Sequence, residues 1–218
     1  MEFIEVVSFD MEKTLIDSGF SDLIWEDDIP RLYGERHGLD FATAKRRVLD
    51  AYGEIGDGQP EWYDVDYWFR RFGLSGDWRE LLSGRSGDVR VFPEVPGVLE
   101  RISDRYRVII SSNTIREFLE VQLATLPDVF SHVFSAPSDY GTVKNDAFYG
   151  KIYNLLGVRP SAVVHVGDSW KFDYKAAVKG GVTAFHLDRS GESEGEHVVH
   201  DLQEFEVMLN RLEDKGLE

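Results

Sequence analysis

Short apolar runs rich in β-branched residues recur along the chain and have the length and composition of buried strands. They lie at residues 3–9, 106–111, 132–135, 162–166 and 182–187. From residue 89 onward these runs alternate with stretches of helical spacing, and an acidic amphipathic helix begins at Leu202. Alternating strands and helices are typical of a parallel sheet that is covered on both faces and joined by right-handed crossovers. The pattern therefore predicts an α/β fold with a Rossmann-like parallel sheet.

The segment between the first and second runs is different, because it has helical spacings and no convincing strand. Helices are predicted at Ile29–His37 and Phe41–Tyr52, with Asp28 and Asp40 as their N-caps, and at Val65–Phe72. Helices without intervening strands indicate a small unit inserted after the first strand. We predict an α/β core domain of residues 1–17 and 87–218 with an inserted α-helical domain of residues 18–86.

Composition and charge narrow the classes of function. The chain has 218 residues, of which 42% are hydrophobic, so it can bury a sizeable core. Its formal net charge of −16 argues against nucleic acid or an anionic membrane surface as a partner. No cysteine is present, which excludes disulfides and thiolate sites. The N-terminus lacks the pattern of a signal peptide and no apolar run could span a bilayer, so a cytoplasmic location is expected.

Polar clusters follow three of the predicted strands. Asp10 and Glu12 come after the first run, Ser112 and Asn113 close the second, and Asp168 comes after the fourth, with Asp173 five residues further on. The carboxyl ends of parallel strands lie at one edge of a sheet, so these clusters are expected to converge. Carboxylates that meet in one crevice repel each other unless a cation lies between them. Oxygen ligands of this kind are those that Mg²⁺ prefers.

Such a cluster is suited to phosphoryl chemistry, in which positive groups neutralise the transferring phosphoryl group. Asp10 is a candidate nucleophile that would form an aspartyl-phosphate. Ser112 and the backbone amides after Asp10 would hold phosphoryl oxygens, and Lys144 would supply further positive charge. Glu12 is placed to donate a proton to the leaving oxygen and later to accept one from water.

With these residues in place, the chain resembles the haloacid dehalogenase-like (HAD) superfamily, specifically the phosphoglycolate-phosphatase-like group with a helical cap inserted after the first motif. The motifs appear in the family's order along the core, and their number makes the resemblance specific. They are matched by Asp10-Met11-Glu12-Lys13-Thr14, by 108–113 ending in Ser112-Asn113, by Lys144, and by Gly167-Asp168 with Asp173.

The resemblance implies a Mg²⁺ ion held by the Asp10 side chain, the Glu12 backbone carbonyl and Asp168, with Asp173 orienting the site. It also implies that residues 18–86 form a cap that closes over the site and selects the substrate. The candidates for phosphate binding are Thr14, Ser112, Asn113 and Lys144. A structural role is the alternative for Asn113.

The sequence departs from the family pattern at three places. Glu12 stands where most of the phosphatases have Asp, although the enolase-phosphatase branch resembles this chain in using Glu. Lys13 replaces a frequent Gly, and Asn145-Asp146-Ala147 follows Lys144 where Pro-Asp-Pro is common. Neither of the last two changes removes a group that the chemistry needs.

The predicted function is Mg²⁺-dependent hydrolysis of a small phosphorylated metabolite through Asp10, by a monomer or homodimer. A phosphomutase would use the same motifs, and a 2-haloacid dehalogenase shares the fold, although its chemistry gives Asp168 and Asp173 no evident purpose. A non-catalytic binding protein that keeps the fold is the alternative from another class.

Other conspicuous side chains have structural interpretations. The aromatic residues between Trp62 and Phe72 have the spacing of a helical-bundle core, which we favour over a pocket lining. His165, inside the fourth strand, is expected to be a packed core residue. His197 and His200 would face opposite ways on a strand and have no evident third ligand, so no metal site is predicted there.

Overall fold

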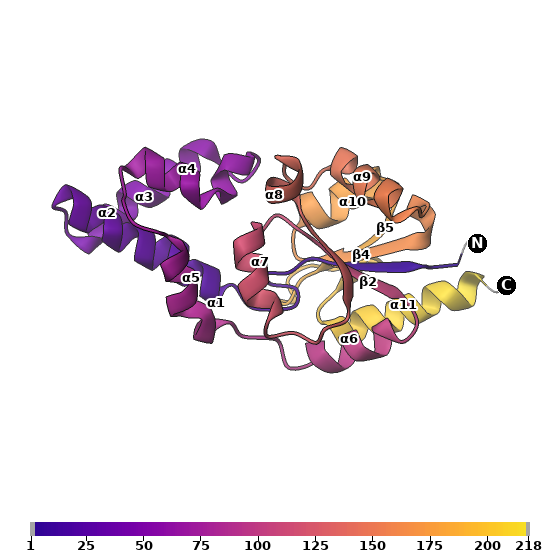
Figure 1. Cartoon of the computed structure of the whole chain (residues 1–218). Coiled ribbons are helices and arrows are strands. Elements are labelled where there is room, and N and C mark those ends of the chain that lie inside the picture. The colour runs from indigo at the N-terminus through magenta and orange to yellow at the C-terminus, as the bar shows by residue number, and fades with distance from the viewer. Residues whose placement is uncertain (1–2, 217–218) are drawn as a thin grey trace.

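A parallel β-sheet forms the centre of the computed structural model, which describes residues 3–216 and the side chains of residues 3–213. Within this range the sheet has six strands in the order β3-β2-β1-β4-β5-β6 (Figure 1). They are β1 (Val6–Phe9), β2 (Arg107–Ser112), β3 (Phe130–Ser135), β4 (Val163–Gly167), β5 (Thr183–Leu187) and β6 (Val198–Val199). The predicted α/β fold with a parallel sheet is confirmed. The two residues of β6 are too few to give a periodic signal, so this strand was not predicted.

Helices cover both faces of the sheet (Figure 1). One face carries α6 (Val95–Ser103), α7 (Arg116–Leu123) and α11 (Leu202–Gly216), and the other carries α8 (Ala136–Tyr140), α9 (Asp146–Leu156) and α10 (Ala176–Lys179). Alternation along β1 explains the two layers, because Val7 and Phe9 pack in the first cluster and Val6 in the second. The ring of Phe9 meets that of Phe205 edge to face at 5.7 Å.

The helical segment of residues 18–86 lies to one side of the sheet (Figure 1). It contains α1 (Gly19–Leu23), a π-helical turn (Ile24–Asp28), α2 (Ile29–His37), α3 (Phe41–Ile55), a 3₁₀ turn (Pro60–Tyr63), α4 (Val65–Phe72) and α5 (Arg79–Arg85). The Asp40 carboxylate caps α3 by accepting a hydrogen bond from the Thr43 amide at 3.0 Å, as predicted.

The prediction that Asp28 caps a helix is wrong. The chain is already helical from Gly19, and the backbone of Asp28 has helical angles. Its carboxylate instead forms a bidentate ion pair with Arg85 at 2.7 and 2.9 Å. The partner lies 57 residues away in sequence, so a local capping pattern could not reveal it.

Aromatic side chains join the helical segment to the sheet domain. Phe118 of α7 contacts Phe20 at 5.6 Å and Trp25 at 5.9 Å, measured between ring centroids. Within the segment, the buried Trp68 packs on Tyr52 and Phe72. One continuous apolar cluster therefore runs from the sheet into the helical segment.

Across residues 3–216, none of the helices combines the length and the hydrophobicity that crossing a bilayer requires.

Candidate active site

The loop that carries the first two carboxylates is held by an arginine from a distant part of the chain. Lys13 has a φ of 58°, a left-handed conformation that is uncommon for a residue other than glycine. Arg189 donates hydrogen bonds to the carbonyl oxygens of Lys13 and Thr14, the second at 2.7 Å. Sequence reasoning missed Arg189, because the hydrogen bonds that hold this loop go to backbone atoms 175 and 176 residues away.

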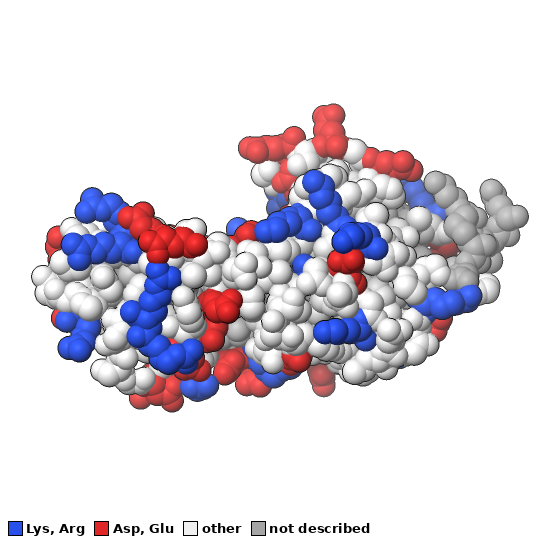
Figure 2. Space-filling view, turned by 90° about the horizontal axis from the view of Figure 1, so that it is seen from above, with Lys and Arg blue, Asp and Glu red and all other residues white. Residues whose placement is uncertain are grey.

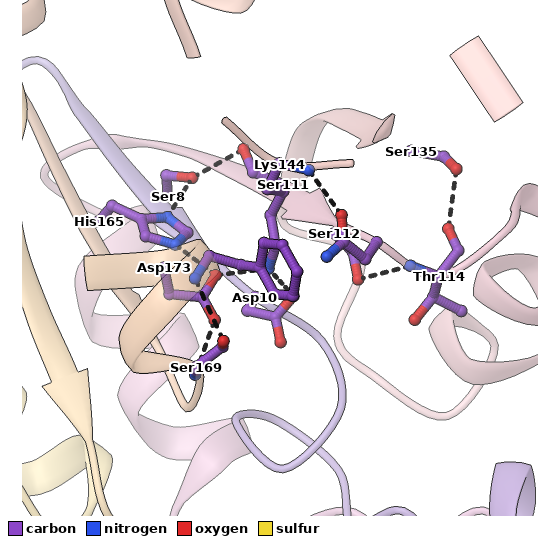
Figure 3. A network of polar contacts seen from close by, with 12 residues as sticks. Ser8, Asp10, Ser111, Ser112, Thr114, Ser135, Lys144, His165, Ser169 and Asp173 are labelled. Carbon is purple, nitrogen blue, oxygen red and sulfur yellow. Dashed lines mark hydrogen bonds and ion pairs between the residues drawn. The ribbon is translucent and has the colours of Figure 1, made fainter. Parts of the chain in front are cut away.

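Lys144 lies between two of the buried carboxylates. Its Nζ donates to Asp10 Oδ1 at 2.7 Å and to Asp173 Oδ1, and the three side chains are almost completely buried (Figure 3). Burial opposes the ionised lysine, but the two carboxylates outweigh it and raise the pKa of Lys144. Burial also opposes ionisation of Asp173, yet Lys144 and His165 lower the pKa of Asp173 to about 2. The structure thus brings these three predicted residues together.

Asp168 is the third carboxylate of this cluster. Unlike Asp10 and Asp173, it has no paired cationic side chain in the described part of the chain to offset its negative charge. Oxygen atoms of Asp10, Asp168 and Asp173 lie within 4.8 Å of one another. No side chain among residues 3–213 pairs with Asp168. Burial, followed by the charges of Asp10 and Asp173, raises the pKa of Asp168 to about 8. A cation among these oxygens would allow all three to ionise at neutral pH, so the residues fit a metal ion with oxygen ligands.

Asp173 fits against Gly167 at the end of β4. A Cβ added to Gly167 would lie 2.3 Å from Asp173 Cγ, which is closer than two such atoms can approach. Asp173 Oδ2 also accepts a hydrogen bond from the Ser169 amide at 2.9 Å. The glycine therefore leaves room for a carboxylate that Lys144 and the Ser169 amide hold in place.

We expect Gly167→Ala to displace Asp173 and to lower the free energy of unfolding by about 1–3 kcal/mol, as overpacking typically does. Urea unfolding in EDTA measures this change without any contribution from a metal. Gly150→Ala in α9 is the matched control, because its Cβ would meet nothing within 4 Å and should leave stability equal or slightly higher. Equal stability of Gly167→Ala and the wild type would contradict this account of the site.

The other candidates for phosphate binding, Ser112, Asn113 and Thr14, differ in where they lie relative to the cavity that holds Asp10. Ser112 is buried at the end of β2, where its Oγ accepts a hydrogen bond from the Thr114 amide at 3.2 Å, and it lines the same cavity as Asp10. Asn113 also lines this cavity, and its Oδ1 accepts a hydrogen bond from the Lys144 amide at 2.7 Å. Thr14 is completely buried and is not among the lining residues. Ser112 therefore lies in the wall of the cavity that holds Asp10, whereas Asn113 positions the Lys144 backbone.

Glu12 lies at the junction with the helical segment. Its Oε1 accepts hydrogen bonds from Ser21 of α1 and from Gln122 of α7, the latter at 2.6 Å. Burial raises the pKa of Glu12 to about 7, although both hydrogen bonds favour the ionised form. A carboxyl with this pKa can donate or accept a proton near neutral pH.

The helical segment contributes to the wall of the cavity of about 250 Å³ that these groups line. Asp57, Trp62 and Tyr63 of that segment line the cavity together with Asp10 and Asp168. The Tyr63 hydroxyl accepts a hydrogen bond from Asn113 at 3.2 Å. The aromatic residues between Trp62 and Phe72 therefore have two roles. Trp68, Phe69 and Phe72 form a helical core, as predicted. Trp62 and Tyr63 line the cavity instead.

A buried polar network lies beneath the carboxylates (Figure 3). His165 Nε2 lies 3.0 Å from Asp173 Oδ1, and its Nδ1 lies 2.9 Å from Ser8 Oγ, which bonds Ser111 Oγ. The Tyr149 hydroxyl lies 3.1 Å from His165 Nε2. His165 is a buried residue as predicted, but the sequence did not reveal that it contacts Asp173.

Most of the chain matches one protein-family model. Residues 4–181 match the family described as haloacid dehalogenase-like hydrolase. The chain belongs to the haloacid dehalogenase-like hydrolase family. Among curated proteins, the GMP/IMP nucleotidase YrfG of Escherichia coli is 28% identical over 71 residues. That match spans 33% of this HAD-like chain and only 32% of the relative's length.

Solved structures share the fold at low sequence identity. A HAD phosphatase from Thermococcus onnurineus superposes with a TM-score of 0.84 at 23% identity, over 94% of this chain and 98% of that one. The HAD-hydrolase YfnB from Bacillus subtilis, described as bound to magnesium, superposes with a TM-score of 0.66 at 16% identity. The match covers 96% of this chain and 100% of that one. An L-2-haloacid dehalogenase from Xanthobacter autotrophicus superposes with a TM-score of 0.61 at 18% identity, over 95% of this chain and 99% of that one. These likenesses establish the HAD fold.

Proposed function

We propose that this HAD-like hydrolase is a Mg²⁺-dependent phosphatase that acts on a small phosphate monoester through an aspartyl-phosphate on Asp10. The observation that supports this most is the unpaired, partly buried Asp168 beside Asp10 and Asp173, a set of carboxylates that a divalent cation would neutralise. Asp10, Asp168 and Asp173 would hold the ion together with the Glu12 carbonyl. When bound, Mg²⁺ would offset negative charge on the carboxylates and the phosphoryl group.

The side chains have complementary parts in the proposed reaction. Lys144 holds Asp10 Oδ1 and offsets the charge of the nucleophile. A carboxylate oxygen of Asp10 forms a bond to phosphorus while the bond from phosphorus to the ester oxygen breaks, and Glu12 gives its proton to that oxygen. Water then attacks the phosphorus of the aspartyl-phosphate, Glu12 takes back a proton, and inorganic phosphate leaves with Asp10 regenerated. Ser112 would donate a hydrogen bond to a phosphoryl oxygen.

The helical segment is proposed to act as a cap on this site. Support comes from the three cavity-lining residues that it contributes, Asp57, Trp62 and Tyr63. The partial match to a GMP/IMP nucleotidase supports phosphate ester chemistry without identifying a substrate. Dehalogenase activity has less support, since attack on carbon gives Asp168 no evident role.

The first test compares hydrolysis of p-nitrophenyl phosphate in Mg²⁺ and in EDTA, beside halide release from 2-chloropropionate. We expect phosphate release that EDTA abolishes and that added Mg²⁺ restores, because removal of the ion leaves the buried carboxylates uncompensated. Halide release without phosphate release would overturn the proposal in favour of a dehalogenase.

The role proposed for Glu12 gives a separate prediction. Glu12→Gln should lower turnover of an alkyl phosphate by about 10²–10⁴-fold, the usual contribution of a general acid. Turnover of p-nitrophenyl phosphate should fall far less, because nitrophenolate leaves without a proton. Glu100→Gln on the exposed side of α6 is the matched control and should change neither rate. Equal losses on both substrates would contradict the acid role.

A further inference from the structure

Lysine side chains gather in a groove beside the active site, in a chain with an excess of acid. The groove has a volume of about 330 Å³ and is lined by the loop that leads into α9, by the π-helical turn Trp170–Lys175 with the start of α10, and by Gly58 of the helical segment. Its lining contains four of the chain's eight lysines, Lys144, Lys171, Lys175 and Lys179, and a single carboxylate, Asp146. Figure 2, which looks down on the face that carries α8, α9 and α10, shows Lys and Arg side chains near the waist between the helical segment and the sheet domain.

The groove adjoins the catalytic cavity. Lys144 and Phe172 line both spaces. Lys171 Nζ pairs with Asp57 Oδ1 at 2.9 Å, and Asp57 is itself a lining residue of the catalytic cavity. The ammonium group of Lys171 therefore lies 2.9 Å from a residue that lines the cavity proposed to hold the leaving group.

Lys144 is paired with Asp10 and Asp173, and Lys179 is paired with Asp146 at 3.0 Å, so the lysines that remain available to a further anion are Lys171 and Lys175. The side chains of Lys171 and Asp57 are 59% and 56% exposed, and ion pairs with this exposure contribute only about 0–1 kcal/mol. Among residues 3–213, no carboxylate lies within ion-pair distance of Lys175, whose Nζ is 5.7 Å from the centre of the Trp170 ring. An incoming anion could replace Asp57 at Lys171 at little cost and meet Lys175 without displacing a carboxylate.

We infer that the leaving group of the substrate carries a second anionic group, which binds Lys171 and Lys175 in this groove. The inference rests on the proposed function, because it describes the substrate of the same site. A local positive region also counters the repulsion that a net charge of −16 imposes on any anionic substrate. The second group is a carboxylate or a phosphate-like group, since both accept hydrogen bonds from ammonium groups.

The test uses phosphate esters that differ only in their distal group. The compounds are 3-hydroxypropyl phosphate, 2-carboxyethyl phosphate and 2-phosphonoethyl phosphate, together with the same series lengthened by two carbons. We expect kcat/KM to be about five- to tenfold higher for an anionic member than for the hydroxyl member of the same length, which corresponds to about 1 kcal/mol. The carboxylate and phosphonate arms distinguish the two kinds of anion. Equal kcat/KM across every series would overturn the inference.

Variants connect the preference to the groove. In Lys171→Gln/Lys175→Gln the ratio of kcat/KM between anionic and hydroxyl esters should fall toward one. Asp57→Asn should lower KM for the anionic esters, because it frees Lys171. Lys151→Gln removes an exposed lysine of α9 that does not line the groove, and it should leave the ratio unchanged. A ratio that survives in the double variant, or that falls equally in Lys151→Gln, would contradict the assignment.

A binding measurement separates this inference from the proposed function. If p-nitrophenyl phosphate is not hydrolysed, the proposed function fails, but calorimetry still compares 2-phosphonoethyl phosphate with 3-hydroxypropyl phosphate as ligands. We expect tighter binding of the phosphonate to the wild type and equal binding of the two to Lys171→Gln/Lys175→Gln. If hydrolysis proceeds without any preference for the anionic esters, the proposed function stands and the second-anion site does not.

Discussion

Asp10→Asn is expected to fold normally and to lose at least about four orders of magnitude in kcat, because it removes the atom that would bond to phosphorus. The amide oxygen can still accept the hydrogen bond from Lys144, so the lysine keeps a partner. We expect the free energy of unfolding to change by no more than about 1 kcal/mol. Turnover of p-nitrophenyl phosphate and urea unfolding measure the two quantities.

Asp50→Asn is the matched control for this substitution. Asp50 is exposed on α3, so the variant makes the same chemical change away from the site and should retain full activity. Residual turnover in Asp10→Asn above about one per cent of the wild type would be inconsistent with a nucleophilic role for Asp10.

Lys144→Met is expected to cause the largest loss of stability. Lys144 is the cation between Asp10 and Asp173, and removing one partner of a buried ion pair costs about 3–5 kcal/mol. Loss of its charge beside the nucleophile should also lower kcat by about 10²–10³-fold. Unfolding in EDTA at pH 7 and turnover in Mg²⁺ measure these effects. Lys151→Met, on the exposed side of α9, should stay within about 0.5 kcal/mol of the wild type.

The stability deficit of Lys144→Met, which is the difference in free energy of unfolding between the wild type and this variant, should depend on pH. In the wild type the pKa of Asp173 is lowered to about 2, so its contribution is present above the unfolded-state pKa and is lost as the pH falls through 2. Without Lys144, burial leaves Asp10 and Asp173 with raised pKa values, and these groups take up protons on folding. The deficit should therefore shrink as the pH falls from 8 to 5. A deficit that is constant over this range would show that the lost stability does not come from the carboxylates.

The convergence of the catalytic candidates could be predicted because it depends on topology more than on detail. Asp10, Ser112 and Asp168 each follow an apolar run, and β1 lies between β2 and β4 in the observed sheet. Any parallel order brings such strand ends to one edge. Lys144 was a candidate because it follows the third predicted strand and matches the family's lysine motif, and its position between Asp10 and Asp173 gives that motif a physical reason.

Contacts between distant residues could not be predicted in the same way. His165 has the apolar neighbours of a core residue, and only its packing against Asp173 and Ser8 reveals the network beneath the site. Arg189 holds the first loop through backbone carbonyls, which carry no sequence information. The division of the aromatic run was missed because helical spacing is the same for a side chain that enters the core and one that faces a cavity.

The most direct test of the central claim is a chemical trap for the phosphorylated enzyme. Wild-type enzyme and Glu12→Gln would be mixed with substrate and Mg²⁺, quenched in acid across the transient phase, reduced with borohydride and analysed by peptide mass spectrometry. We predict that Asp10 is converted to homoserine in proportion to the trapped aspartyl-phosphate, and that omission of substrate or Mg²⁺ prevents the conversion. Continued hydrolysis with Asp10 unmodified at every time point, or modification of a different residue, would contradict the account.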